Sequence, residues 1–224
     1  MKAERASRWI QACRWGALLI LGLGYAVLAH LAAASSAPDL QGALVAITPL
    51  FALAFMMAWR SPRRTALLVL LLGACAVAYS WGNWLVAHYN WVFLLQHAGT
   101  YALLGAAFGR TLQRDQTPMI SRFAAIAHGG LLSPALTRYT RAVTWAWTLY
   151  FGGTAALSLL LFWLAPVPVW SAFANLLGIP LLGLMFVGEY AVRCCVLPVA
   201  DRAGPLDAIR AYRQAASEDK ARRI

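Results

Sequence analysis

The chain has 224 residues, of which 61% are apolar and only 12% are charged. Soluble domains carry about 25% charged residues. This composition, with a mean hydropathy of +0.62, excludes a disordered chain and argues against a soluble globular domain. The apolar residues are grouped in long runs, and about 20 such residues in a helix cross a bilayer. We therefore expect an all-α, polytopic transmembrane helical bundle.

The basic residues are strongly segregated along the chain. Nineteen Lys and Arg against eight Asp and Glu give a net charge of +11. The Lys and Arg fall in four clusters, at 2–14, 60–64, 110–141 and 193–223. The connections between them at 35–42, 82–90 and 165–171 contain none. This alternation follows the positive-inside rule and predicts a multi-pass membrane protein with both termini in the cytoplasm. The basic charge then serves orientation and attraction to anionic lipid headgroups, and we do not expect nucleic-acid binding.

The hydropathy pattern predicts six transmembrane helices within 15–192, after a basic cytoplasmic leader at 1–14 and before a basic cytoplasmic tail at 193–224. The expected helices cover 15–34, 43–59, 66–81, 91–109, 142–164 and 171–192. Pro49 lies inside the second, and Gly178 and Pro180 interrupt the sixth. We interpret the first as an uncleaved span because further spans follow it. The ten tryptophans flank these helices, as an aromatic belt does.

Two further helices are expected outside the spans. The segment PMISRFAAIAH at 118–128 lies in the long connection between the fourth and fifth spans. Its initial proline and mostly apolar character are typical of a short helix on the membrane surface. The end of the tail, after Gly204 and Pro205, reads as a cytoplasmic amphipathic helix.

Polar groups within the apolar runs are candidates for function because hydrocarbon disfavours them. His97 is the deepest titratable group, about 20 Å from the cytoplasmic surface by helical rise. It either carries protons or orients a ligand, or it is a packing residue that hydrogen-bonds another helix, as Gln96 also could. Glu189 precedes Arg193 by four residues, which predicts an ion pair on one helix face. A direct His97–Glu189 dyad is not expected at these depths.

A third group of candidates surrounds the stretch HGGLLSPALTRYTR. Its polar members are His128, Arg138, Tyr139, Thr140 and Arg141. Arginine offers paired donors to phosphate, and histidine exchanges protons near neutral pH. With Glu189 and Arg193 at a similar depth, these residues could form a pocket for an anionic headgroup or a phosphopantetheine. The alternative is that the arginines only set the topology.

No motif of known catalytic or cofactor chemistry is present. The sequence contains no GxSxG, Walker A, HExxH, GxGxxG or HxxxxD element. The cysteines Cys13, Cys75, Cys194 and Cys195 have neither CxxC spacing nor matching histidines. We therefore expect no metal and no cofactor.

Three stretches together resemble a known family: LLQHAGTYALLGAAFGRTL (94–112), SPALTRYTRAVTWAWTLYF (133–151) and FANLLGIPLLGLMFVGEYAVR (173–193). They are similar to an uncharacterised family of bacterial inner-membrane proteins encoded beside fatty-acid-synthase-like enzymes in aryl-polyene and xanthomonadin-type pigment clusters. The resemblance covers about residues 90–210, and the first two helices match only in hydropathy. It implies partners such as acyl carrier protein, a ketosynthase, an acyltransferase or an exporter. It supplies no catalytic residues.

The function we expect is that of a non-catalytic inner-membrane accessory protein for the biosynthesis or transfer of a lipid-like acyl product of polyene type. Two alternatives remain open at this point. One is a small membrane enzyme that acts on an acyl or lipid substrate at the cytoplasmic face through His128 or His97. The other is a small transporter or flippase with a path beside Pro49 and Pro180.

Overall fold

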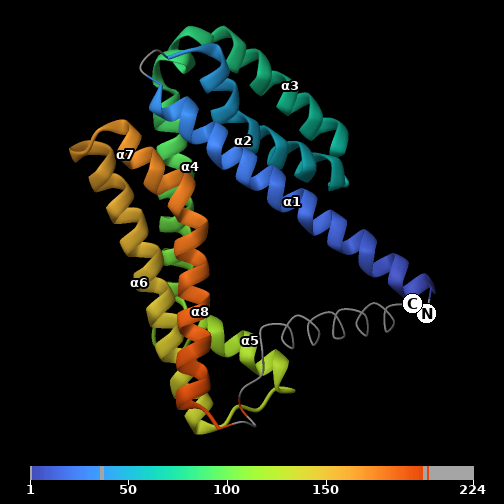
Figure 1. The fold of residues 1–224 in the computed structure, drawn as a ribbon, viewed down its shortest axis with the longest axis vertical. Coiled ribbons are helices and arrows are strands. Elements are labelled where there is room, and N and C mark those ends of the chain that lie inside the picture. Colours follow the sequence, from blue (N-terminus) through green and yellow to red (C-terminus); the bar gives the residue numbers. More distant parts are fainter. Residues whose placement is uncertain (1, 36–37, 199–200, 202–224) are drawn as a thin grey trace. The chain divides into compact units, whose positions relative to one another are not determined.

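The computed structural model is all-α and describes residues 2–35, 38–198 and 201 (Figure 1). Its elements are α1 (Lys2–Ala34), α2 (Leu40–Arg60), α3 (Arg64–Ser80), α4 (Gly82–Arg110), α5 (Met119–Ala127), α6 (Pro134–Leu164), α7 (Val167–Ser171), the π-helical segment η1 (Ala172–Leu177) and α8 (Gly178–Val196). Five spans are long and apolar enough to cross a membrane: Cys13–Ala34, Leu40–Arg60, Gly82–Arg110, Pro134–Leu164 and Val167–Val196. The remaining expected span, α3, is apolar but has only 17 residues.

Several helices begin earlier than the hydropathy pattern predicts. The leader expected at 1–14 is helical from Lys2 onward, and the connection expected at 82–90 is the first part of α4. The apolar span Cys13–Ala34 agrees with the first expected span, whereas the connection expected at 82–90 was wrong because hydropathy marks only the apolar part of a helix. No proline or glycine interrupts the polar and aromatic residues at 83–90, and one residue, Trp81, separates α3 from α4. The backbone departs from helical geometry only at His88, where a kink falls.

The start of α6 shows why its boundary also differs from the predicted one. We expected this helix from residue 142, and it begins at Pro134. Ser133 Oγ accepts a hydrogen bond from the Leu136 N–H at 3.1 Å, which is how serine caps a helix. Proline suits the first helical position because its missing N–H would have no partner there. Arg138 and Arg141 therefore lie on a helix rather than in a connection.

The last expected span is divided into three segments. After α7, the chain forms the six-residue segment η1, and α8 begins at Gly178. We predicted an interruption at Gly178 and Pro180, and the irregular backbone lies just before both. Proline at position 180 has no N–H to donate one turn back, so the ordinary α-helical bond to the Leu176 carbonyl cannot form there. The predicted C-terminal helix after Pro205 lies outside the described residues.

The described chain divides into two compact units. The first unit contains the residues up to His97 together with 158–178. Within it, α2 packs beside α3 (Figure 1), and α1 packs against α2, α7 and η1. Gly42 makes the packing around Tyr89 possible, because an added Cβ would lie 2.8 Å from the Tyr89 ring. Tyr89 in turn donates a hydrogen bond to the Ala32 carbonyl at 2.7 Å, so one buried ring joins α1, α2 and α4.

The second unit contains residues 98–157 with 179–198 and 201. Its buried core consists of Leu136, Tyr139, Val143, Trp147, Phe151 and Leu197. Two glycines four residues apart on α4 allow close packing on α6. A Cβ added to Gly105 would lie 3.3 Å from the backbone nitrogen of Gly152. A Cβ added to Gly109 would lie 3.3 Å from Thr148 Cγ2. Small residues at this spacing are a common basis of helix association in membranes.

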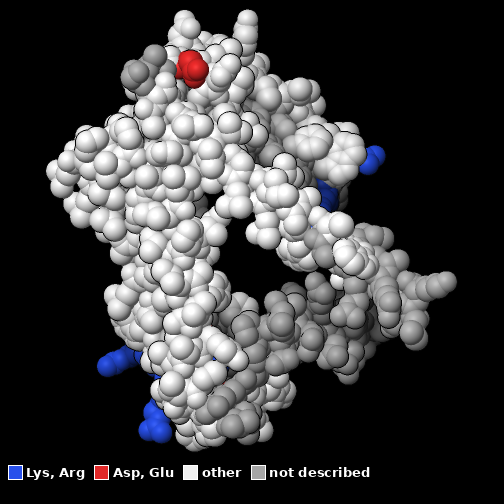
Figure 2. Space-filling model, viewed as in Figure 1, with Lys and Arg blue, Asp and Glu red and all other residues white. Residues whose placement is uncertain are grey.

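Helix α5 confirms the short helix expected at 118–128, and its place on a membrane surface stays a prediction. Its C-terminal end turns at Gly129 and Gly130, both with positive φ, and Gly130 N–H bonds the Ala125 carbonyl at 2.7 Å. Glycine is favoured in such a turn because it lacks a Cβ. On the visible face of the described residues, the few charged side chains leave broad surfaces without charge (Figure 2). Such uncharged surfaces suit contact with lipid.

Candidate functional site

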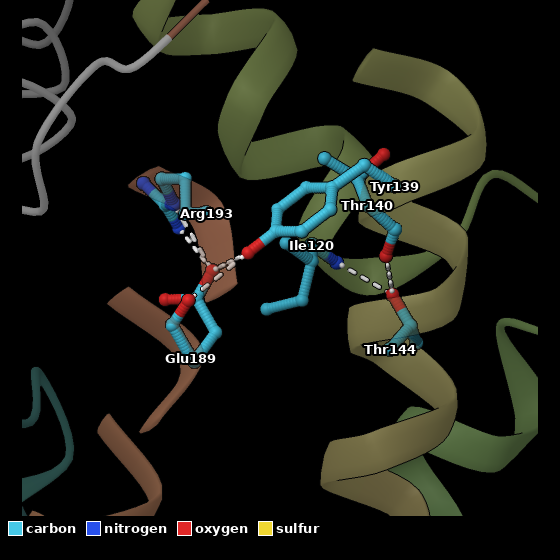
Figure 3. A network of polar contacts seen from close by, with 6 residues as sticks. All are labelled: Ile120, Tyr139, Thr140, Thr144, Glu189 and Arg193. Carbon is cyan, nitrogen blue, oxygen red and sulfur yellow. Dashed lines mark hydrogen bonds and ion pairs between the residues drawn. The ribbon is translucent and has the colours of Figure 1, made fainter. Parts of the chain in front are cut away.

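The second unit brings Tyr139, Glu189 and Arg193 together (Figure 3). Glu189 Oε1 accepts from Arg193 Nη2 at 2.7 Å and from Arg193 Nε at 3.0 Å. The same oxygen accepts from the Tyr139 hydroxyl at 2.9 Å, and that hydroxyl also lies 3.1 Å from the Glu189 carbonyl oxygen. We call these three residues the α6–α8 triad. The ion pair predicted from the spacing of Glu189 and Arg193 is present, and Tyr139 adds a partner on α6.

The triad is largely shielded from solvent. The side chain of Arg193 is 18% exposed and that of Glu189 is 8% exposed. A charged group is tolerated at such burial when it is paired and hydrogen-bonded. Because the guanidinium and the carboxylate compensate each other, the triad has no net charge. Its chemical role is therefore to place a fixed, polar anchor in an otherwise apolar wall.

One groove of the second unit opens beside the triad, and we call it the aromatic groove. It has a volume of about 540 Å³ and contains Glu189 and Arg193 in its wall. The rest of the wall is mostly apolar and includes six aromatic side chains, namely Tyr101, Phe108, Phe123, Trp147, Phe151 and Phe186. Small-molecule sites have volumes of roughly 300–1,000 Å³ and combine such walls with a few polar groups.

The aromatic rings of this groove are arranged in mutual contact. The ring centroids of Trp147 and Phe186 lie 4.7 Å apart, and those of Trp147 and Phe151 lie 5.3 Å apart. Phe108 meets Phe151 edge to face at 5.3 Å. Trp147 and Phe151 are buried, whereas Phe186 and Phe123 are half exposed. The buried rings thus hold the wall, and the exposed rings offer their surfaces to a ligand.

A second groove lies between α6 and α8, and we call it the α6–α8 groove. Its volume is about 820 Å³, and Tyr139 and Glu189 line it together with Arg138. The remaining wall is small or aliphatic, formed by Ala135, Ala142, Val143, Ala146, Leu184, Met185, Gly188, Val192, Val196 and Leu197. Of the triad, Glu189 lines both grooves, Arg193 lines the aromatic groove and Tyr139 lines the α6–α8 groove.

The other candidates of the basic segment have separate partners. Arg141 Nη2 donates to the Leu112 carbonyl at 3.1 Å, so this guanidinium holds the end of the segment that follows α4. His128 Nδ1 bonds the Ala124 carbonyl at 2.9 Å at the end of α5. Thr140 Oγ1 lies 2.7 Å from Ser121 Oγ. Of the predicted group, Arg138, Tyr139, Glu189 and Arg193 line the two grooves, whereas His128, Thr140 and Arg141 line neither.

The first turn of α5 is held by hydroxyl groups of other segments. Met119 N–H donates to Thr111 Oγ1 at 2.9 Å, and Ile120 N–H donates to Thr144 Oγ1 at 3.3 Å (Figure 3). The Ser121–Thr140 contact continues this row. The N-terminal N–H groups of a helix need such acceptors. Threonines on α6 thus fix α5 in place as one wall of the aromatic groove, through Ile120 and Phe123.

His97 belongs to the first unit, where it contacts other helices. His97 Nδ1 lies 3.0 Å from Ser158 Oγ on α6, and its ring meets Phe173 edge to face. The neighbouring Gln96 donates to the Ala46 carbonyl on α2 at 2.5 Å. These contacts favour the packing interpretation of both residues.

Sequence reasoning missed the buried residues that His97 contacts. Trp170 and Ser158 are fully buried, and Trp170 Nε1 donates to Ser158 Oγ at 3.1 Å. The adjacent Ser171 lies 3.0 Å from His30 Nδ1 and accepts from Asn175 Nδ2 at 3.1 Å. A serine within an apolar run gives little signal of its own. Only the presence of Trp170, Ser171 and Asn175 within one short stretch could have marked this segment.

Neither a metal site nor a disulfide is formed by the described residues. No group of three His, Cys, Asp or Glu side chains within 2–35, 38–198 and 201 is placed to hold a metal ion. The four cysteines are free thiols, and Cys13, Cys75 and Cys195 are exposed.

The fold defines the class of protein: five long apolar helical spans make this chain a multi-pass membrane protein. Comparisons with protein-family profiles, with curated proteins and with solved structures found no match. The resemblance to the pigment-cluster family therefore stays a prediction, and the two grooves and the triad are the features of the molecule that bear on its function.

Proposed function

We propose that the protein is a non-catalytic accessory protein of the membrane that holds a lipid-like acyl chain, of polyene type, in the aromatic groove. One observation carries this proposal: an open groove of about 540 Å³ is lined by six aromatic rings and has one compensated ion pair in its wall. A flat conjugated chain can stack on such rings, and favourable aromatic contacts contribute about 0.5–1.5 kcal/mol each.

The polar group in the groove wall suits orientation of the chain. Arg193 and Glu189 are bonded to each other, so neither needs a ligand charge for compensation. A carboxyl, thioester or hydroxyl at the end of the acyl chain can still share the outer lone pairs and N–H groups. The groove lining includes hydroxyls of Thr100 and Tyr101 but no histidine, serine or cysteine among the described residues. These side chains support holding and transfer more than covalent chemistry.

The partners that we propose follow from the resemblance and from the orientation of the chain. An accessory protein of this kind would receive its cargo from an acyl carrier protein, a ketosynthase or an acyltransferase at the cytoplasmic face. We propose the bacterial inner membrane, six crossings and cytoplasmic termini, because the Lys and Arg clusters alternate with connections that lack them. The sixth crossing requires α3, whose 17 residues extend about 25 Å.

A binding experiment with a conjugated tetraene fatty acid tests the proposal. The full chain in detergent micelles is excited at its tryptophans, and energy transfer to the bound tetraene is followed. The groove variants are Phe123→Ser and Phe186→Ser, and the matched control is Phe55→Ser, a similarly exposed ring of the first unit. Each groove variant should weaken the affinity about two- to tenfold, while the control leaves it unchanged. Equal affinity in all four proteins would contradict the proposal.

A turnover assay separates holding from catalysis. The purified chain is incubated with an acyl carrier protein that bears a conjugated acyl group, and the acyl species are followed by mass spectrometry. We expect binding without a change in the mass of the acyl group. A new covalent product that depends on His128 or His97 would favour the small membrane enzyme instead.

A further inference from the structure

Arg138 differs from the other basic residues around the triad in having no partner among the described residues. Arg193 is bonded to Glu189, and Arg141 donates to the Leu112 carbonyl. Arg138 is exposed and lines the α6–α8 groove. Glu189, the one carboxylate in that groove's lining, is already compensated by Arg193. Within the part of the chain that the structure describes, Arg138 is therefore a positive charge in this groove without a paired carboxylate.

The α6–α8 groove has the dimensions of one leaflet. Its wall on α6 runs from Ala135 to Ala146, and this distance is about 16 Å at 1.5 Å per residue. The hydrocarbon core of a bilayer is about 30 Å thick, so the groove is about half as long. Arg138 lies near the start of α6, one turn from the end of the groove.

The groove lining matches a hydrocarbon chain in shape and polarity. Ala142, Ala146 and Gly188 leave space between the two helices, and all three are exposed. Larger aliphatic side chains of α8, including Leu184 and Val192, line the groove beside these three small residues. Inside a bilayer such a surface binds an acyl chain through van der Waals packing, because the surrounding lipid is equally apolar.

We propose that the α6–α8 groove binds an anionic phospholipid of the bilayer, with one acyl chain in the groove and the phosphate on Arg138. The guanidinium offers two parallel N–H donors that fit a phosphate. Basic sites between membrane helices on the cytoplasmic side commonly take anionic headgroups. This groove shares Val143 and Glu189 with the aromatic groove, but lipid binding on Arg138 does not depend on whether the aromatic groove holds an acyl product. The lipid would brace α6 against α8 around the triad.

Lipid titration of thermal unfolding tests this site. The full chain in detergent is titrated with phosphatidylglycerol or with phosphatidylcholine of the same acyl chains, and the unfolding midpoint is measured. A ligand that binds the folded state raises this midpoint with its concentration. We expect a larger rise with phosphatidylglycerol than with phosphatidylcholine. Arg138→Gln should weaken the apparent affinity for phosphatidylglycerol on the order of fivefold, and Arg114→Gln, an exposed arginine outside the groove, should not.

A second pair of variants tests the groove itself. Ala142→Leu places a larger side chain in the groove, and Ala106→Leu makes the same change on an exposed site of α4 outside it. We expect Ala142→Leu to reduce the response to phosphatidylglycerol and Ala106→Leu to retain it. Three results would overturn the proposal: equal responses to the two lipids, full phosphatidylglycerol affinity in Arg138→Gln, or the same midpoint rise with inorganic phosphate alone. If Arg138→Gln does not fold, the comparison of Ala142→Leu with Ala106→Leu decides.

Discussion

Replacing Glu189 by glutamine tests the role of the triad, because this change keeps the shape and removes the charge. The wild-type oxygen accepts three hydrogen bonds, two from Arg193 and one from Tyr139. Charge-assisted bonds are about twice as strong as neutral ones, and a bond to a charged group contributes about 1.5–3 kcal/mol. Halving the two Arg193 bonds therefore lowers the free energy of unfolding by about 2 kcal/mol.

Replacement by alanine should be more severe. Glu189→Ala removes the carboxylate that pairs with the mostly buried Arg193 guanidinium, and losing one partner of a buried pair costs about 3–5 kcal/mol. For a chain of 150–250 residues, 1 kcal/mol corresponds to about 2–4 °C. The unfolding midpoint should thus fall by roughly 4–8 °C in the glutamine variant and further in the alanine variant.

The assay is thermal unfolding of the purified chain in detergent, with Asp115→Asn as the matched control. Asp115 is exposed and has a positive φ, a conformation that asparagine also accepts, so this control should stay within about 0.5 kcal/mol of the wild type. The double variant Glu189→Ala with Tyr139→Phe should lose less stability than the sum of the two single variants, because Glu189 and Tyr139 share one hydrogen bond. A glutamine variant as stable as the control would refute the reasoning.

Three other predictions concern packing and topology. Gly105→Leu should lower the unfolding midpoint by several degrees, because its side chain meets Gly152, whereas Gly24→Leu has open space and should change it little. Ser158→Val should cost about 1–3 kcal/mol in a denaturant titration, since it removes the partner of His97 and Trp170. We expect His97→Gln to retain function and to lower stability by about 1 kcal/mol or less. Loss of function at that small cost in stability would instead support a proton-carrying role of His97. Alkaline-phosphatase fusions should be active after residues 38, 81 and 166 and inactive after 62 and 117, and activity at 117 would contradict the proposed orientation.

The sequence allowed the helices and one ion pair to be predicted, because these depend on local spacing. Long apolar runs mark the spans, and the four-residue interval between Glu189 and Arg193 marks their pairing. Helix ends were less predictable because caps decide them, as Ser133 does for α6. The short helix α5 was recognised from its proline and its apolar character.

The grooves and the different contacts of the individual arginines could not be predicted. Arg138 and Arg141 are three residues apart, and on a helix this spacing puts both side chains on one face. In the structure, Arg141 bonds a carbonyl from the segment after α4 while Arg138 lines the α6–α8 groove. Which neighbour each arginine meets depends on tertiary packing. Trp147 and Trp170 show the same limit, since both fit an interfacial belt by sequence and both are buried.

Photo-crosslinking tests the central claim most directly. A fatty acid with a diazirine near the end of its chain is bound to the full chain in micelles, irradiated, and its attachment sites are identified by mass spectrometry. The account predicts adducts on α5 and α8 at or beside Phe123 and Phe186, and an excess of conjugated tetraene fatty acid should suppress them. Adducts spread over α1, α2 and α3 and insensitive to that competitor would contradict an acyl-binding role for the aromatic groove.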